Sequence, residues 1–154
     1  MANFLLERKQ DLSIIYWLKE LFEDIPDIGI VDGYPEGDLE LPSIAVEAED
    51  IFFVKKEMGN RRGDKHRLWS IDVYGNNKTQ RDFMAYKILQ NIEDGIEVSD
   101  FDEGFPPDSN PSQLGTLRPV TESITATPIR IFPDLVEKLY WRYRIRFITE
   151  YHSL

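Results

Sequence analysis

Two segments of the chain repeat apolar side chains at the period of an α-helix. Over residues 3–22 apolar residues recur at steps of three and four, and Pro26, which has no backbone N–H, ends the segment. A second stripe with the spacing i, i+3, i+4, i+7 is formed by Ala85, Ile88, Leu89 and Ile92. Asn77 or Thr79 can cap the start of this second helix, and Gly95 ends it. The pattern predicts two amphipathic helices.

Other segments have the character of β-strands, most clearly residues 65–74. Trp69, Ile71 and Val73 lie at alternate positions there, so that one face of the strand is apolar. The predicted strands are residues 28–31, 43–48, 65–74, 96–101, 120–131 and 140–151. A polar turn is expected at 58–64 and a single helical turn at 133–139. A loop at 102–115, rich in proline and glycine, is long for a compact domain, and its length suggests that it is functional or mobile.

The order of these elements, which is helix, strands, helix and strands, predicts an α+β fold. Few connections are long enough for a parallel crossover, so the sheet is expected to be mixed and mostly antiparallel, with two helices packed on one face. The length of 154 residues is typical of one domain, and 42% hydrophobic residues suffice for one core. A single domain over residues 1–154 is therefore expected.

The composition excludes several classes of site. The chain has no cysteine, which rules out disulfides, a thiol nucleophile and thiolate metal ligands. No apolar run approaches the roughly 20 residues needed to cross a bilayer, and the first residues do not resemble a secretory signal. We therefore expect a protein of the cytoplasm with no membrane partner.

The net charge of −10 is unevenly distributed along the chain. Residues 1–60 hold 14 acidic and five basic side chains, and residues 76–115 hold eight and three. Residues 61–75 and 116–154 each carry a net charge of +2. An acidic body argues against tight binding of duplex DNA, which needs a broad cationic face. The two basic segments instead favour self-association, in which a basic strip of one copy meets the acidic surface of its neighbour.

Candidate catalytic residues are few and poorly spaced. His66 and His152 are predicted on different strands without the further partners of a metal site or a triad. Four carboxylates on adjoining strands could hold Mg²⁺ as in a nuclease, namely Glu47, Glu49, Asp50 and Asp72. That chemistry also needs a lysine in register, and Lys78 is expected in a loop. A solvated acidic face explains the carboxylates better, so we expect no enzyme activity and no catalytic, cofactor-binding or metal-binding residue.

The last predicted strand is the most unusual feature of the sequence. Arg142, Arg144 and Arg146 alternate with Trp141, Tyr143, Ile145 and Phe147, which makes one face cationic and the other apolar. The cationic face has two interpretations of equal weight. It is a solvated surface balanced by cross-strand acids such as Glu122, or it contacts a carboxylate-rich partner or phosphate, of which the acidic body favours the carboxylate. We take the three arginines, with Arg61 and Arg62 of the polar turn, as candidate interface residues.

As a whole, the chain resembles the tail terminator proteins of long-tailed bacteriophages. The likeness lies in the order of its parts after the N-terminal helix. "LPSIAVEAED" (41–50) precedes the turn "GNRRGDKHR" (59–67), and "LWSIDVYGNNKTQRDFMAYKILQNIE" (68–93) joins a strand to a helix. A long proline-rich loop and "YWRYRIRFITEY" (140–151) complete the order.

The resemblance implies a ring, usually of six subunits, that caps the head-proximal end of the tail tube. Its partners would be copies of itself, the major tail tube protein and the head-tail connector or stopper protein, and DNA would pass through the lumen without being read. The protein would reside in the virion, and in the host cytoplasm during assembly. Two alternatives stay open. One is another neck protein, such as a head-completion or stopper protein. The other is an acidic DNA mimic, which the arginine stripe disfavours.

Overall fold

The computed structural model describes residues 5–25, 27–33, 40–54, 64–129 and 141–154. The predicted helical turn at 133–139 and most of the polar turn at 58–64 lie outside these residues. Within them, no helix has the length and hydropathy to span a membrane.

The two predicted helices are present close to their expected bounds. Helix α1 spans Leu6–Leu21 and helix α2 spans Lys78–Ile92. Asn77 is the N-cap of α2, where its side chain accepts a hydrogen bond from the Gln80 N–H at 2.8 Å. The Gln80 side chain in turn accepts from the Asn76 N–H at 2.8 Å. These reciprocal bonds satisfy backbone donors that the first helical turn leaves unpaired, and they fix where α2 begins.

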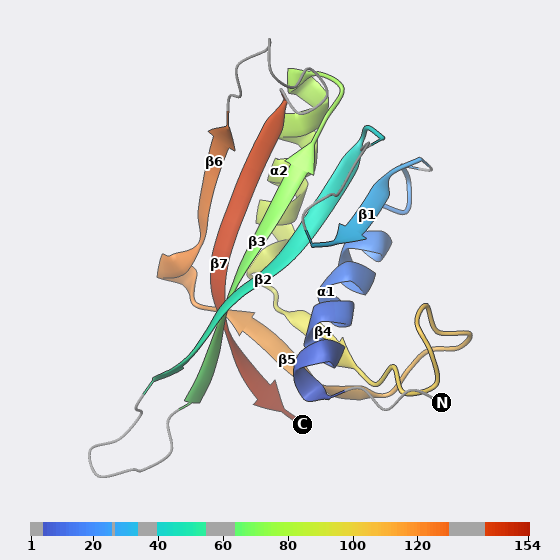
Figure 1. Ribbon diagram of the computed structural model, residues 1–154, viewed down its shortest axis with the longest axis vertical. Helices are drawn as coiled ribbons and strands as arrows, with labels where there is room; N and C mark the ends of the chain where they lie inside the picture. Colours follow the sequence, from blue (N-terminus) through green and yellow to red (C-terminus); the bar gives the residue numbers. More distant parts are fainter. Residues whose placement is uncertain (1–4, 26, 34–39, 55–63, 130–140) are drawn as a thin grey trace.

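Seven strands of the described residues form one curled sheet in the order β1-β2-β3-β7-β5-β4, with β6 also paired to β7 (Figure 1). Their bounds are β1 Gly29–Asp32, β2 Ser43–Val54, β3 Asp64–Tyr74, β4 Ile96–Ser99, β5 Gln113–Pro119, β6 Thr125–Ile129 and β7 Arg142–Ser153. β1 is parallel to β2, and the other pairs are antiparallel. The predicted α+β class with a mixed, mostly antiparallel sheet is confirmed.

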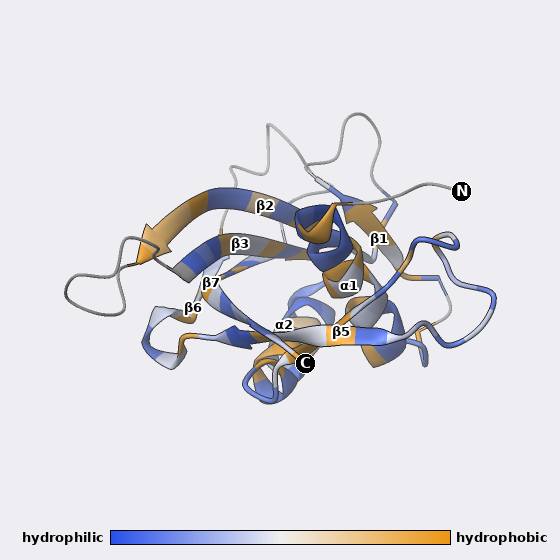
Figure 2. Ribbon diagram, turned by 90° about the horizontal axis from the view of Figure 1, so that it is seen from below, coloured by the Kyte–Doolittle hydropathy of each residue, from blue (hydrophilic) through white to orange (hydrophobic). Residues whose placement is uncertain are grey.

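Both helices pack on the same face of this sheet and share one hydrophobic core (Figure 2). From the helices the core takes Ile14, Ile15, Leu18, Met84, Ala85, Ile88 and Ile92. From the sheet it takes, among others, Val46, Trp69, Ile71, Val73, Ile145 and Phe147. The Trp69 indole N–H donates to Thr149 Oγ1 at 2.9 Å, so its one polar atom is satisfied inside the core. The opposite, outer face of β2, β3 and β7 carries charged side chains, among them Asp72, Arg144 and Arg146.

The predicted strand at 120–131 is only partly right, because the structure has a 3₁₀ turn, η1, at Thr121–Ser123 and then the shorter strand β6 in that range. A separate strand, β5, spans Gln113–Pro119 and begins inside the predicted loop. β7 is 12 residues long, and β5 and β6 each cover a different part of one of its edges. Between them, Ser123 Oγ accepts a hydrogen bond from the Ile148 N–H at 2.8 Å. A side chain of the turn therefore takes the place of a hydrogen bond between strands. The hydropathy pattern does not reveal this exchange.

β2 is twice as long as predicted, extending from Ser43 to Val54 where residues 43–48 were expected. A register shift between Ala48 and Ile51 interrupts its pairing with β3. Such a bulge adds an unpaired residue and reverses the alternation of side chains, so the apolar residues after it no longer fit the earlier pattern. The alternation on which the prediction rested ends there, although the strand continues.

Gly115 allows β5 to approach β7 closely. A Cβ atom at this position would lie 2.4 Å from the His152 carbonyl oxygen and 2.7 Å from the Tyr151 ring. Backbone atoms cannot move aside cheaply, so we expect Gly115→Ala to lower the free energy of unfolding by about 1–3 kcal/mol. Chemical denaturation of both proteins measures the difference. An unchanged denaturation midpoint would show that β5 can move away from β7 without a loss of stability.

Candidate assembly surface

The three arginines of β7 lie on the outer face of the sheet, beside carboxylates of their own chain. Asp72 of β3 is directly opposite Arg144 in the strand register. Arg144 Nε is 3.0 Å from Asp72 Oδ1, and Arg142 Nη2 is 2.6 Å from Asp72 Oδ2. The Asp72 side chain is only 2% exposed, so the two guanidinium groups hold a buried carboxylate between them.

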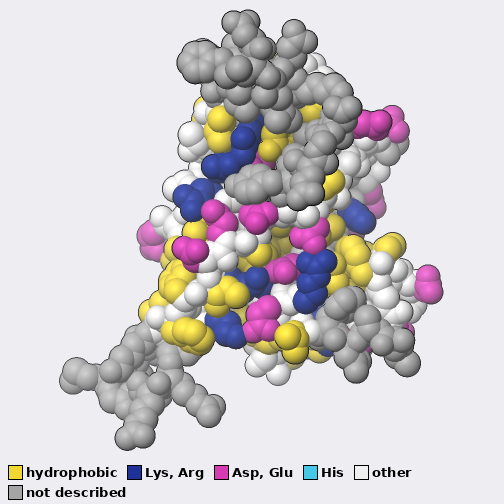
Figure 3. Space-filling model, in the orientation of Figure 1, with side chains coloured by type: hydrophobic (Ala, Val, Ile, Leu, Met, Phe, Trp, Pro, Cys, Tyr) yellow, Lys and Arg dark blue, Asp and Glu magenta, His cyan; other side chains and the backbone are white. Residues whose placement is uncertain are grey.

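Arg146 differs from the other two arginines. Its Nε is 3.2 Å from Glu49 Oε2, and its side chain is 46% exposed, against 13% for Arg142 and 31% for Arg144. Glu49 also accepts a hydrogen bond from Ser70 Oγ at 2.5 Å. Figure 3 shows basic and acidic side chains lying next to one another over β2, β3 and β7.

Cross-strand acids therefore balance the arginines, as one of the two interpretations expected, but Arg142 and Arg144 are less solvated than that interpretation assumed. The expected acid partner was Glu122, but that residue lies in η1, and Arg146 faces Thr125 of β6 in the register. The strand pairing, which sequence does not give, selects Asp72 and Glu49 instead. The assignment of the arginines to an interface stays a prediction, and Arg146 is the most exposed of them. Arg61 and Arg62 lie outside the described residues.

A second surface feature is the hairpin arm, which we define as residues 51–54 of β2 and 64–67 of β3. Phe53 is 70% exposed, Ile51 45% and Val54 38%. These side chains follow the bulge and lie beyond the two helices, so no core covers them. In Figure 3 apolar side chains gather where this arm leaves the body of the protein. The run "IFFV" is visible in the sequence as four consecutive apolar residues before a polar turn, but its exposure is not.

The base of the hairpin arm is fixed to the first turns of α1. The Arg67 guanidinium donates to the Glu7 carbonyl at 2.9 Å and to Gln10 Oε1 at 3.0 Å, and lies 2.9 Å from Asp11 Oδ1. It also stacks on the Trp69 ring, with its Cζ atom 4.1 Å from the ring centroid. These contacts fix the base of the hairpin arm to α1, although the side chains of Ile51, Phe53 and Val54 face solvent.

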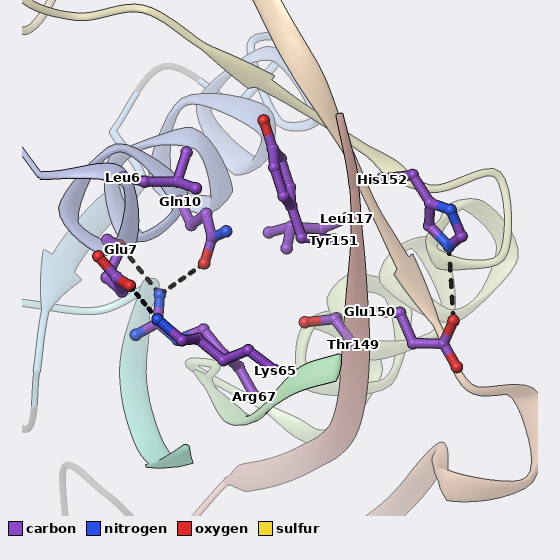
Figure 4. A pocket seen from close by; sticks show the side chains of 10 residues that line it. All are labelled: Leu6, Glu7, Gln10, Lys65, Arg67, Leu117, Thr149, Glu150, Tyr151 and His152. Atoms are coloured by element: carbon purple, nitrogen blue, oxygen red, sulfur yellow. Dashed lines mark hydrogen bonds and ion pairs between the residues drawn. The ribbon is translucent and has the colours of Figure 1, made fainter. Parts of the chain in front are cut away.

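A groove of about 230 Å³ lies beside the base of the hairpin arm (Figure 4). Its lining is Leu6, Glu7, Gln10, Lys65, Arg67, Leu117, Thr149, Glu150, Tyr151 and His152. Lys65 Nζ is 2.5 Å from Glu7 Oε1, and this bond lowers the pKa of the Glu7 carboxyl. Nearby, burial raises the pKa of Asp11, while the Arg67 guanidinium opposes that rise. The charges of the groove are matched within the chain and form no arrangement of nucleophile and base.

The other candidate residues do not assemble into a reactive site. His66 and His152 meet across Glu150, at 3.6 and 3.4 Å from its two oxygens. Within the described part of the chain, however, no group of three or more histidine, cysteine or acidic side chains can hold a metal ion. Lys78 was expected in a loop, but it is the first residue of α2 and pairs with Asp82 at 3.3 Å. Its ion pair lies within the helix.

Comparisons with known proteins give little independent guidance. No family model matches the chain, and no curated protein matches it. One similar solved structure is a chain of the "Virion of native gene transfer agent (GTA) particle", with 14% identity and a TM-score of 0.48 over 98% of each chain.

Proposed function

We propose that this protein is a structural subunit of a phage-like particle, and that it acts as a tail terminator. Copies of the chain form a ring, with six subunits as the expected number, on the head-proximal end of the tail tube. The ring stops tube polymerisation and offers a docking surface to the head connector, while DNA passes through its lumen. The protein catalyses no reaction in this role.

The hairpin arm is the observation that carries the proposal. The arm is fixed to α1 and exposes Ile51, Phe53 and Val54 to water, which does not stabilise a monomer. Contiguous exposed apolar side chains are typical of surfaces that contact another protein. The terminator role, as distinct from assembly in general, is supported by the order of sequence elements that the chain shares with that family.

The charge of the protein suits a conduit for DNA. Each phosphate that a protein neutralises adds salt-dependent affinity, which would slow a passing duplex. A chain with a net charge of −10 avoids this, and its outer-face arginines already contact Asp72 and Glu49. The lumen is therefore expected to be acidic or neutral.

Removal of the protein from its particle should abolish control of tail length. Without a terminator, tube polymerisation has no stop at the head-proximal end, so we expect tails of irregular or excessive length that fail to join heads. Electron microscopy of particles assembled with and without the protein measures this. Tails of normal length without it would point to a head-completion or stopper protein, and a ring at the distal tip would contradict both roles.

A further inference from the structure

We infer that neighbouring copies join by β-strand pairing, in which the outer edge of β2 of one copy adds to the outer edge of β6 of the next. This contact deepens the proposed function and rests on it, since it describes how the ring would be held together. It would extend the sheet of each subunit into that of its neighbour.

Among the described strands, none pairs with the outer edge of β2 over the second half of the strand. β1 pairs only with Ser43–Val46, and the last bond on that side is from the Gly33 N–H to the Val46 carbonyl at 2.6 Å. From residue 47 to residue 54 the described strands pair with β2 only on its β3 side. An edge of this length, with unpaired backbone donors and acceptors, is a template for another strand.

The outer edge of β6 is the second open edge. β6 pairs with β7 alone among the described strands, and Thr125, Thr127 and Pro128 are exposed. The edge at β4 is different, because α1 packs along that strand and Ser13 Oγ accepts a hydrogen bond from the Ser99 N–H at 3.1 Å. β2 and β6 lie at opposite margins of the sheet (Figure 2), so each copy presents one of each. Two unlike edges on opposite sides are what a head-to-tail ring requires.

Charge and backbone chemistry favour the unlike pair over two like pairs. Joining β2 to β2 would bring two copies of Glu47, Glu49 and Asp50 together, and like charges on facing strands repel. Joining β6 to β6 would oppose two Pro128 residues, each without a backbone donor. In the β2–β6 pair, the acidic residues of β2 approach β6. β6 lies beside β7, which carries the three arginines. One of these is Arg146, exposed and in register with Thr125.

The same contact accounts for the exposed apolar side chains of the hairpin arm. Ile51 and Phe53 belong to the open part of β2. When β6 of the neighbouring copy pairs with that edge, the neighbouring copy covers these two side chains. Edge pairing supplies directional hydrogen bonds, and the covered apolar side chains supply the area-dependent part of the affinity. The partner that fits both requirements is a second copy of this chain.

Cysteine cross-linking tests the contact, because the natural chain contains no cysteine. The test protein carries Asp50→Cys on β2 and Thr127→Cys on β6, both at exposed positions. A short bis-maleimide linker tolerates a shift of register by one residue. We expect the double variant to give a ladder of covalent dimers, trimers and larger species, and each single variant to stay uncross-linked. As a matched control, Asp50→Cys combined with Gln90→Cys, at an exposed position of α2, should give no ladder.

Light scattering on the same samples separates the two proposals. Oligomers of native mass without a ladder would overturn β2–β6 pairing and leave the ring standing on another surface. Dimers from Asp50→Cys alone would also overturn it, because β2 would then pair with itself. A monomer at all concentrations, alone and with tail tubes, would overturn the proposed ring itself.

Discussion

Replacing Arg144 with glutamate is expected to lower the free energy of unfolding by about 3–5 kcal/mol, which is the usual cost of breaking a buried ion pair. Asp72 is 2% exposed, and two guanidinium groups contact its carboxylate. The substitution removes one of them and places a second carboxylate directly opposite Asp72 in the strand register. Arg142 alone then faces two negative charges in a site with little access to water.

Thermal and chemical denaturation measure this loss. The matched control is Arg146→Glu, two positions along the same face, where the ion pair is with Glu49 and the arginine is 46% exposed. Exposed pairs contribute about 0–1 kcal/mol, so this variant should melt close to the natural protein. Equal melting of the two variants would show that Asp72 does not depend on Arg144. A solvated arginine face would predict normal melting for Arg144→Glu, and the burial of Asp72 is the reason that a loss of stability is expected instead.

Replacing Phe53 with aspartate is expected to abolish assembly and leave the fold intact. The Phe53 side chain is 70% exposed, so the monomer loses little when it is removed. In the assembled ring the same side chain would be covered, and burying a phenylalanine contributes about 1.5–3 kcal/mol. Each contact should therefore weaken by about tenfold to a hundredfold, and the closed ring multiplies that loss over its contacts.

Light scattering gives the oligomer mass, and head joining gives the activity of the particle. Phe83→Asp is the matched control, since Phe83 is an exposed phenylalanine that belongs to α2 and to neither strand edge. We expect Phe83→Asp to assemble as the natural protein does. A Phe53 variant that melts normally and still assembles would remove the hairpin arm from the interface.

Much of the fold could be predicted from sequence because its signals are local. The helical stripes gave α1 and α2, and the alternation around Trp69, Ile71 and Val73 gave the buried face of β3. The alternation of arginines and apolar residues correctly separated the two faces of β7, with Ile145 and Phe147 in the core. Each of these signals lies within one element, where the geometry of helix or strand sets the spacing of side chains.

The candidate site could be predicted only in part, because it depends on which strands are neighbours. The position of Asp72 between Arg142 and Arg144 follows from the β3–β7 register, which joins residues that are 70 and 72 positions apart in the chain. The length of β2 beyond its bulge, and the division of one edge of β7 between β5 and β6, are further products of pairing. No local pattern encodes such long-range choices.

The sequence by itself determined the fold class, the two helices, the inward faces of the main strands and the uneven distribution of charge. The tertiary structure decided which of those charges are already paired within the chain and which backbone edges remain open. The physical reason is that side-chain periodicity is fixed by the local backbone, whereas ion-pair partners and edge exposure are fixed by strand register, which is settled only when the whole sheet packs against its helices.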